Sequence, residues 1–460
     1  MGCKVADSQG MSEKDSTRAY RQELIAIRQA TGIFLEVIRS VDIEEVIEQR
    51  VKIKNDLLQI DGETLELSHY KEIVLIGLGK ASLRMGATVE RLLGERITRG
   101  ILVTNRAEEV RVKSEIIVAR HPVPDGNSLI AGKKIIELVK SCDADTLILF
   151  LLSGGGSALV ELPIADEVTL EDLQELNRVL VNCGATIREI NTIRKHLSRI
   201  KGGRLGHLAR RSKCVALYLS DVNPGDMLSI ASNPLMPDTA TLADFYAVIE
   251  KYHLMELLPA SIRNLIHQGK VGRLPEDWNG EGPQALHVLL LDNADLVNRA
   301  ARIAECRGFR VAINLNQIEG RYQQVADELI QSLLELKSRF PDEKVCVVSG
   351  GEVSCPVQGS GTGGRNQEFV LYCAKRLAEQ NHALQAAVLA CGSDGIDGNS
   401  DAAGAAAGAA TVHIAQSKGF IAADYLKNND SHAFFKQSGG LVVTGPTGNN
   451  VRDLRILLAL

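Results

Sequence analysis

Short apolar runs, about 4–8 residues long as is usual for strands, alternate along the chain with segments whose apolar residues recur at the helical period. This alternation is typical of parallel strands joined by crossover helices, so the sequence predicts an α/β architecture. The predicted strands are Ile73–Leu78, Ile101–Thr104, Glu115–Val118, Thr146–Leu152, Cys214–Ser220, Leu286–Leu291, Arg310–Asn314, Val345–Ser349, Ala386–Ala390 and Leu441–Thr444. The predicted helices are Thr17–Arg39, Ser82–Leu93, Ser128–Lys140, Leu170–Arg188, Thr241–Lys251, Ala294–Arg307, Tyr322–Arg339 and Gln367–Glu379.

Two segments interrupt this pattern. Residues 266–286 are polar and rich in glycine and proline, so they mark the predicted boundary between two domains, 1–275 and 285–460. The alanine- and glycine-rich stretch 402–410 is predicted to form a helix of small residues that packs closely against another element. At the N-terminus we expect a frayed tail through about Ser16.

Composition narrows the classes of function. The 460 residues carry a formal net charge of −5, which does not supply the cationic field that nonspecific nucleic-acid binding requires. No apolar run approaches the roughly 18 residues that span a bilayer, and there is no apolar signal core, so we expect a cytoplasmic protein without a membrane partner. The nine cysteines suit reduced thiols better than a disulfide framework. The most unusual number is 41 glycines.

Many of these glycines lie where a predicted strand meets a helix. Segment 77–80 reads Gly-Leu-Gly-Lys, but the third glycine of a dinucleotide fingerprint is replaced by Ser82, and the spacing of a Walker A loop is absent. Lys80 at the start of a helix would add a cation to the free N–H groups there, which favours a phosphate or carboxylate site. The alternative is a solvated lysine on the first helical turn.

A second glycine cluster, Gly154–Gly156, lies between Ser153 and Ser157 after a fully apolar strand. Consecutive glycines cost backbone entropy, so they indicate that anion oxygens approach the backbone itself, with the serine hydroxyls as further donors. A tight turn without a ligand is the alternative. Ser157 lacks the G-x-S-x-G context of a hydrolase nucleophile, because Leu159 stands two residues later.

Asp221 follows another predicted strand. A carboxylate at the carboxyl end of a strand is typical of metal or substrate binding, and equally of helix capping.

The second half of the chain repeats this organisation. Ser349–Glu352 ends a strand, and the glycine-rich segment 359–364 delivers Arg365 to the start of a helix. An arginine there offers a planar fork for a carboxylate or a transferring phosphoryl group, and pairing with Glu368 is the alternative. Asp394, Asp397 and Asp401 then lie among four glycines, without the spacing of an EF-hand, and predict a Mg²⁺-phosphate site or support for the arginine. Together these loops favour phosphoryl transfer in a cleft between two domains.

In these motifs the chain resembles the class II glycerate kinases, the family whose C-terminal half carries the MOFRL region. The matching motifs follow in order over nearly the whole chain: GLGKAS (77–82), HPVPD (121–125), SGGGSAL (153–159), NTIRKHLSRIKGGRL (191–205), SDV (220–222), SGGE (349–352), GTGGRNQE (361–368), GSDGIDG (392–398) and TGPTGNNV (444–451).

The resemblance implies an N-terminal Rossmann-like domain with a largely parallel sheet, a smaller C-terminal MOFRL-type α/β domain, and an active site in the interdomain cleft. It implies that the protein is a kinase that uses ATP and Mg²⁺ to phosphorylate D-glycerate to 2-phosphoglycerate. We expect a monomer or homodimer whose ligands are a nucleotide and a small-molecule substrate.

The resemblance also assigns residues by motif. Lys80 is expected to contact the substrate or the transferring phosphate, Arg365 the glycerate carboxylate or the developing charge, and Asp221 is a candidate general base. The candidate substrate- and phosphate-binding residues are Gly79, Ser153, Gly154, Gly155, Gly156, Ser157, Lys195, Glu352, Asn366 and Glu368. The candidate Mg²⁺ ligands are Asp394 and Asp397, which are also alternatives for the base. A family motif also contains Arg194, Lys195, His196 and Lys201, which by themselves indicate a solvated basic helix end.

Two other functions compete with this interpretation. An NAD(P)-dependent hydroxypyruvate reductase is one, because some family members carry that name, but the fingerprint fails at Ser82 and no acidic residue follows a second strand at the expected distance. A small-molecule sensor that has kept the fold is the other. Its motivation is that Asn233 and Leu235 stand where the family usually has a glycine and a hydroxyl residue.

Overall fold

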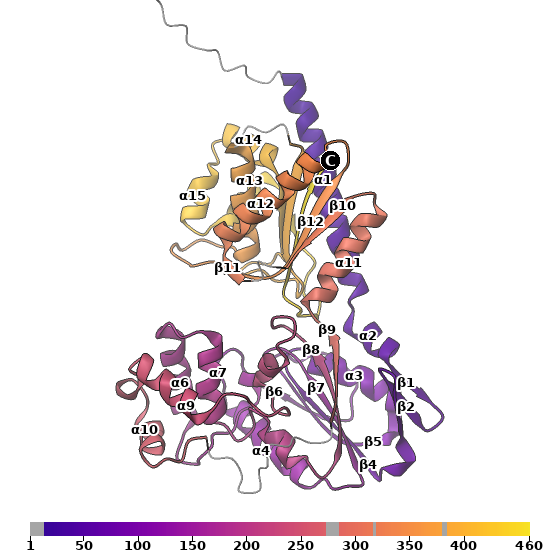
Figure 1. The fold of residues 1–460 in the computed structure, drawn as a ribbon, viewed down its shortest axis with the longest axis vertical. Coiled ribbons are helices and arrows are strands. Elements are labelled where there is room, and N and C mark those ends of the chain that lie inside the picture. The colour runs from indigo at the N-terminus through magenta and orange to yellow at the C-terminus, as the bar shows by residue number, and fades with distance from the viewer. Residues whose placement is uncertain (1–12, 273–284, 316–318, 380–383) are drawn as a thin grey trace, which may run out of the picture. The chain divides into compact units, whose positions relative to one another are not determined.

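The computed structural model describes residues 13–272, 285–315, 319–379 and 384–460, which form two compact units. One unit runs from Asp42 to Asp292, and the other joins the chain up to Val41 to Asn293–Leu460. Figure 1 shows both as α/β units. Each is described by itself below, the first as the Asp42 unit and the second as the Asn293 unit.

A six-stranded parallel sheet forms the centre of the Asp42 unit. Its strands are β4 (Glu72–Leu78), β5 (Ile97–Thr104), β6 (Glu115–Val118), β7 (Thr146–Leu152), β8 (Lys213–Leu219) and β9 (Ala285–Leu291). Their order across the sheet is β6-β5-β4-β7-β8-β9, and every neighbouring pair is parallel. All residues of β7 are buried, as its continuous apolar sequence predicts for a central strand. Because β4, β7 and β8 are neighbours, their carboxyl ends and the loops that follow them meet at one edge.

Helices and a small meander complete this unit. The helices are α2 (Ile43–Arg50), α3 (Ser82–Leu93), α4 (Gly126–Lys140), α5 (Gly156–Leu159), α6 (Leu170–Asn182), α7 (Ile187–His196), α8 (Arg204–Leu208), α9 (Leu242–Lys251) and α10 (Ala260–His267). Four 3₁₀ turns are found among the described residues: η1 (Leu67–His69), η2 (Gly94–Arg96), η3 (Met227–Ser232) and η4 (Leu254–Glu256). An antiparallel meander consists of β1 (Val51–Lys54), β2 (Leu57–Ile60) and β3 (Glu63–Glu66).

The predicted helix Leu170–Arg188 is wrong in its extent, because two helices occupy this region. Gly184 adopts φ +80° just after α6, which ends that helix. Thr186 then starts α7 with a capping box, accepting from the N–H of Glu189 while the Glu189 side chain accepts from the N–H of Thr186. Because α7 starts afresh at Thr186, its side chains do not continue the helical phase of α6. Together with α9 and α10, the two helices share a separate apolar core.

A mixed sheet forms the centre of the Asn293 unit. Its strands are β10 (Arg310–Asn314), β11 (Glu319–Arg321), β12 (Val345–Ser354), β13 (Ala386–Gly392), β14 (Gly404–Ala407), β15 (Leu441–Val442) and β16 (Asp453–Ala459). The order is β10-β12-β16-β13-β14-β15, with β11 paired to β12. β10 and β11 are parallel to β12, and the other neighbouring pairs are antiparallel. Helices α1 (Glu13–Ser40), α11 (Asn293–Cys306), α12 (Tyr322–Arg339), α13 (Arg365–Glu379), α14 (Ala409–Ser417), α15 (Ala422–Lys427) and α16 (Ser431–Ser438) belong to the same unit.

The small-residue segment 402–410 is mainly a strand, so the predicted helix is wrong there. Residues 404–407 form β14, and α14 starts only at Ala409. A Cβ on Gly404 would overlap the carbonyl oxygen of Ala390 on the neighbouring strand. The small side chains therefore allow close strand pairing beneath α1 and α13, both of which contact β14.

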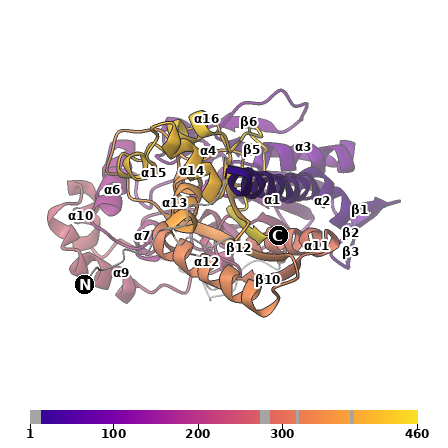
Figure 2. The same ribbon diagram turned by 90° about the horizontal axis from the view of Figure 1, so that it is seen from above.

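The division of the chain differs from the predicted one at both ends. Helix α1 packs on β13, β16, α11 and α14 of the Asn293 unit, beside α11 and α14 in Figure 2. The buried carboxylate of Glu23 anchors it, accepting hydrogen bonds from the N–H groups of Ala410 (2.6 Å) and Thr411 (2.9 Å) at the start of α14. At the other end, strand β9 pairs with β8 and so belongs to the Asp42 unit. Within the described residues, no helix has the length and apolarity needed to cross a membrane.

Candidate active site

The loop after β4 is attached to the loop after β7. The N–H of Lys80 donates to the carbonyl of Gly154 (2.9 Å), and the N–H of Ala81 donates to Ser153 Oγ (3.1 Å). Gly79 has φ +130°, and a Cβ there would overlap Ser153. Gly79 and Ser153 therefore join the two loops, and they hold Lys80 at the end of β4 next to the Gly154–Gly156 segment.

The glycines of the second loop leave room for the side chains around them. A Cβ on Gly154 would overlap the Asp221 carboxylate, which comes from the end of β8. Gly155 is left-handed, with φ +84°, and a Cβ there would lie 3.1 Å from both His121 Cδ2 and Lys80 Cγ. The side chains of Lys80, His121 and Asp221, from three different loops, thus lie against the bare backbone of these glycines.

This loop has positive groups without carboxylate partners. In the described part of the chain, the side chains of Lys80 and Arg194 have neither an ion pair nor a hydrogen bond, and both are half-buried. Over the same residues, the N–H groups of Gly154 and Gly155 donate no hydrogen bond to protein. Cations and amides left open at one sheet edge are what an anionic ligand needs.

His121 lies beside these cations. Its ring is exposed at the rim of the loop, yet the surrounding protein desolvates it, and this desolvation together with Lys80 and Arg194 lowers the pKa of His121 to about 4. The ring is therefore neutral at pH 7. Burial also lowers the pKa of Arg194, while the Glu161 carboxylate acts in the opposite direction.

Ser157 begins a short chain of hydroxyl and amide groups. Its Oγ lies 2.8 Å from Ser232 Oγ, which donates to Asn191 Oδ1 at 3.3 Å. The partner of Ser157 is thus another hydroxyl, in agreement with the absence of a nucleophile motif. Because Asn191 lies on α7, one turn before Arg194, this chain also connects α7 to the glycine loop.

The structure directs Lys195 elsewhere than predicted. Its ammonium forms an ion pair with Asp238 (2.9 Å), and both groups line a cavity of about 450 Å³ between α7, α9 and the loop that follows β8. Lys201 is likewise paired with Glu161 in the interior. Of the four basic residues in this motif, Arg194 is the one whose charge, together with that of Lys80, lowers the pKa of His121. Sequence reasoning missed it because α7 was not predicted as a separate helix, so the directions of its side chains could not be inferred.

Arg365 lies in a different environment, in the Asn293 unit. It starts α13, and its guanidinium binds the Asp453 carboxylate with two hydrogen bonds, Nε to Oδ2 (2.5 Å) and Nη2 to Oδ1 (2.9 Å). Nη2 also donates to Glu352 (3.0 Å). Burial opposes the charge of Arg365, but Asp453 and Glu352 outweigh it and raise the pKa of the guanidinium. The alternative of a pair with Glu368 is wrong.

Asn366 and Glu368 lie in the interior, at 0% and 1% exposure. Both oxygens of Glu368 lack a hydrogen bond of standard geometry, and although Ser431 faces the carboxyl group, burial raises the pKa of Glu368 to about 7. Asp397 accepts the N–H groups of Asn366 (3.0 Å) and Gln367 (2.9 Å) and also their side-chain amides. It therefore caps the first turn of α13, and burial raises its pKa to about 6.

The two predicted Mg²⁺ ligands, Asp394 and Asp397, both have protein partners in this arrangement. The oxygens of Asp397 are occupied by α13, and Asp394 Oδ1 accepts the N–H of Ile396 (3.1 Å). Across the described residues, no group of three or more His, Cys, Asp or Glu could hold a metal ion. The assignment of Asp394 and Asp397 to Mg²⁺ has no support from this geometry.

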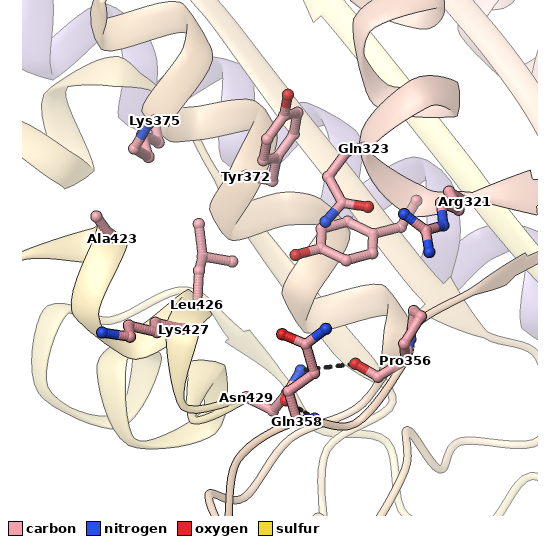
Figure 3. A pocket seen from close by; sticks show the side chains of 11 residues that line it. Arg321, Gln323, Pro356, Gln358, Tyr372, Lys375, Ala423, Leu426, Lys427 and Asn429 are labelled. Atoms are coloured by element: carbon pink, nitrogen blue, oxygen red, sulfur yellow. Dashed lines mark hydrogen bonds between the residues drawn. The ribbon is translucent and has the colours of Figure 1, made fainter.

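A further cavity of about 350 Å³ lies in the Asn293 unit, and Figure 3 shows its lining side chains. Its cations are Arg321, Lys375 and Lys427, and its aromatic residues are Tyr322 and Tyr372. Lys375 pairs with Glu379 (2.6 Å), and Tyr372 donates to Asp327 (3.1 Å). None of the predicted site residues lines it.

Comparison with known proteins gives consistent results over both units. Residues 29–267 match a family described as a domain of unknown function (DUF4147), and residues 345–453 match the MOFRL family. A D-glycerate 2-kinase of Thermotoga maritima is 38% identical over 86% of this chain and 92% of its own length. A protein of Agrobacterium vitis named "Putative hydroxypyruvate reductase" is 37% identical, over 84% and 86%. The crystal structure of a glycerate kinase from Thermotoga maritima superposes with a TM-score of 0.80 at 33% identity, covering 94% of this chain and 99% of that one.

Proposed function

The chain belongs to the glycerate 2-kinase family, and we propose that it transfers the terminal phosphoryl group of ATP to the 2-hydroxyl of D-glycerate, giving 2-phosphoglycerate and ADP. In this reaction the 2-hydroxyl oxygen forms a bond to the γ-phosphorus, while the bond from that phosphorus to the β,γ-bridging oxygen breaks. The hydroxyl proton passes to a base, and ADP leaves with the bridging oxygen.

The observation that carries this proposal is the Lys80 loop. An ammonium group and the N–H groups of Gly154 and Gly155, all without protein partners in the described residues, lie together at the carboxyl edge of the sheet. Phosphoryl transfer is catalysed mainly by positioning and by electrostatic stabilisation of the phosphoryl oxygens. We therefore assign Lys80 and these amides to the charge of the transferring group.

Asp221 is the proposed proton acceptor. Its carboxylate packs against the Cα of Gly154, so it lies at the same loop as the groups assigned to the phosphoryl oxygens. A base must come within hydrogen-bond reach of the hydroxyl that it deprotonates, and Asp221 is the predicted carboxylate that meets this loop.

Arg365 remains a proposed active-site residue, but most of its guanidinium is already bound by protein and cannot grip a ligand as a two-pronged fork. Because Asp453 holds Nε and Nη2, only Nη1 lacks a hydrogen bond within the described residues. We propose that Arg365 acts through this edge on developing negative charge. Mg²⁺ accompanies ATP in this proposal and supplies charge neutralisation on the phosphates.

The reductase and sensor alternatives receive less support. The third position of the failed fingerprint, Ser82, is buried and donates its hydroxyl to Val103 (2.6 Å). The unusual Asn233 has a structural explanation, since its side chain accepts the N–H groups of Leu235 (3.0 Å) and Met236 (2.9 Å) and donates to Met227. Leu235 is fully buried among the apolar residues under the sheet. Neither departure from the family pattern therefore indicates a lost activity.

The test is product identification. Purified protein with ATP, Mg²⁺ and D-glycerate should release ADP, and ³¹P NMR should show the phosphate on the 2-hydroxyl. Preparations of Lys80→Ala from the same host control for contaminating kinases. Oxidation of NADH or NADPH with hydroxypyruvate in the absence of ATP would contradict the proposal, and a 3-phosphate product would correct its regiochemistry.

A further inference from the structure

Arg194 stands out among the arginines near the sheet edge. It is half-buried on α7, and its guanidinium has no ion pair and no hydrogen bond within the described residues. The carboxylate whose field it experiences, Glu161, is already bound by Lys201 and Ser198. An arginine held close to protein without a partner loses hydration without compensation. The lost hydration raises the free energy of the unliganded protein, and a bound anion would compensate for it.

Two observations relate Arg194 to the Lys80 loop, the position of its helix and its charge. His121, whose ring meets Lys80 at Gly155, is under the influence of both cations. One turn earlier on α7, Asn191 accepts the hydrogen bond from Ser232, which in turn contacts Ser157 of the glycine loop. Helix α7 thus presents Arg194 toward the same loop that carries Lys80.

The different shapes of the two cationic groups suit them to different anionic groups of the substrates. The ammonium of Lys80 is a compact point charge, whereas a guanidinium is a planar fork that matches both oxygens of a carboxylate. In D-glycerate the carboxylate is attached to the carbon that bears the 2-hydroxyl. A group that holds the carboxylate must therefore lie near the group that handles the phosphoryl oxygens. The charges of Arg194 and Lys80 both act on the ring of His121.

We propose that Arg194 binds the carboxylate of D-glycerate and thereby selects hydroxy acids over neutral alcohols and amides. The inference rests on the proposed kinase function and deepens it. Arg365, which the family resemblance relates to this carboxylate or to the developing charge, has its fork occupied by Asp453. The fork of Arg194 is open.

Steady-state kinetics of Arg194→Ala and Arg194→Lys test the proposal. Arg188→Ala is the matched control, because Arg188 is an exposed arginine on the same helix whose side chain has no partner in the described residues. We expect the KM for D-glycerate to rise by about 10–100-fold in Arg194→Ala, as for a lost charge-assisted pair, with a much smaller change in kcat. Arg194→Lys should lie between, and Arg188→Ala should match the wild type.

A second substrate separates carboxylate binding from a structural role. The wild type should strongly prefer D-glycerate to its neutral amide, and Arg194→Ala should lose most of this preference, because the amide never used the fork. An unchanged preference, or a fall in kcat with an unchanged KM, would overturn the assignment. If Arg194→Ala does not fold, as judged by thermal melting, Arg194→Lys carries the same test.

Different measurements would contradict the proposed kinase function and the proposed role of Arg194. A wild-type protein that releases no ADP with D-glycerate contradicts the kinase function. Calorimetric titration with D-glycerate alone then still decides the role of Arg194. Binding that is lost in Arg194→Ala but kept in Arg188→Ala supports it, and binding that is equal in both variants, or undetectable in the wild type, overturns it.

Discussion

The two glycine-rich sites use their positive charges in opposite ways. In the Asp42 unit, Lys80 and Arg194 have no carboxylate partner within the described residues, and the adjacent amides are bare. In the Asn293 unit, Arg365 is bound by Asp453, and Arg455 is fully buried and donates to the carbonyls of Gly350 (2.5 Å) and Gly351 (3.1 Å). A cation near a glycine loop can thus either lack a protein partner, as Lys80 does in the described residues, or hold the loop in place, as Arg455 does.

This contrast has an energetic consequence. Removing a cation that has no partner costs the folded protein little, and it affects the ligand instead. Removing a cation that neutralises a buried carboxylate leaves that charge uncompensated, which is strongly destabilising. Activity and stability should therefore respond separately in the two units.

Lys80→Ala should produce the largest effect. We expect turnover to fall by about 10²–10³-fold, the usual loss when one group that stabilises transition-state charge is removed. The melting temperature should stay near that of the wild type, because no ion pair of Lys80 is lost. ADP release and calorimetry on the same preparation measure both quantities.

Lys134→Ala serves as the control for Lys80→Ala, since Lys134 forms only an exposed ion pair with Glu115 on the same unit. It should leave both turnover and melting temperature nearly unchanged. Near-normal turnover in Lys80→Ala would instead return Lys80 to the alternative of a solvated lysine.

Arg365→Ala, unlike Lys80→Ala, should clearly lower the stability of the folded protein. Asp453 is 0% exposed, so its carboxylate would lose its main counter-charge. Breaking a fully buried pair costs about 3–5 kcal/mol, and because Arg365 is partly exposed we expect about 2–3 kcal/mol in urea unfolding. Asp453→Asn in the same chain should recover most of this loss.

A second substitution separates structure from catalysis at this position. Arg365→Lys keeps the charge near Asp453 but removes the second hydrogen bond and the free Nη1 edge. We expect it to be more stable than Arg365→Ala and still impaired in turnover. Full turnover in Arg365→Lys would mean that the Nη1 edge takes no part in the reaction.

Much of the fold was predictable because it depends on local sequence signals. The fully apolar run Thr146–Leu152 and the strand Ile73–Leu78 were identified because buried parallel strands have a continuous apolar pattern. The strand within segment 402–410 was not predicted, since alanine favours helices in isolation. It is the close approach of this segment to Ala390 that favours a strand here. The position of α1 on the Asn293 unit was equally hidden, because the contact of Glu23 with α14 joins residues far apart in the sequence.

The candidate site was predictable as far as its loops, and no further. Lys80, Asp221 and the Gly154–Gly156 segment meet because parallel strands in neighbouring positions end at one edge. The sequence did not reveal that Arg365 is neutralised by Asp453, or that Lys195 is paired with Asp238 while Arg194 has no ion pair in the described residues. Both depend on side-chain directions that the packing of whole units decides.

Glu368→Gln should stabilise the protein at alkaline pH. Burial raises the pKa of Glu368 from its usual 4.5 to about 7, so between these values the folded state binds more protons than the unfolded state. The contribution of Glu368 to stability therefore falls as pH rises from about 4.5 through about 7, by at most about 3 kcal/mol.

Urea unfolding of Glu368→Gln and the wild type should measure this difference. At pH 8 we expect the variant to be more stable by about 2 kcal/mol, below the upper limit because Ser431 compensates part of the buried charge. At pH 4.5 the difference should shrink to nearly zero. A difference that does not change with pH would show that Glu368 is ionised in the folded protein throughout.

His121 gives the smallest and most specific test of the uncompensated charge. Its pKa of about 4 has desolvation as its main cause, with Lys80 and Arg194 as additional ones. Lys80→Ala should therefore raise the pKa of His121 by less than about one unit and leave it below the usual 6.5, which NMR titration of the ring can follow. Because the folded pKa lies below the unfolded one, His121 lowers stability as pH falls below 6.5, and Lys80→Ala should weaken this acid sensitivity slightly. Arg188→Ala should move neither quantity. A His121 pKa that does not respond to Lys80→Ala would mean that the ammonium is not held at the glycine loop, and with it the contrast between the two units would fail.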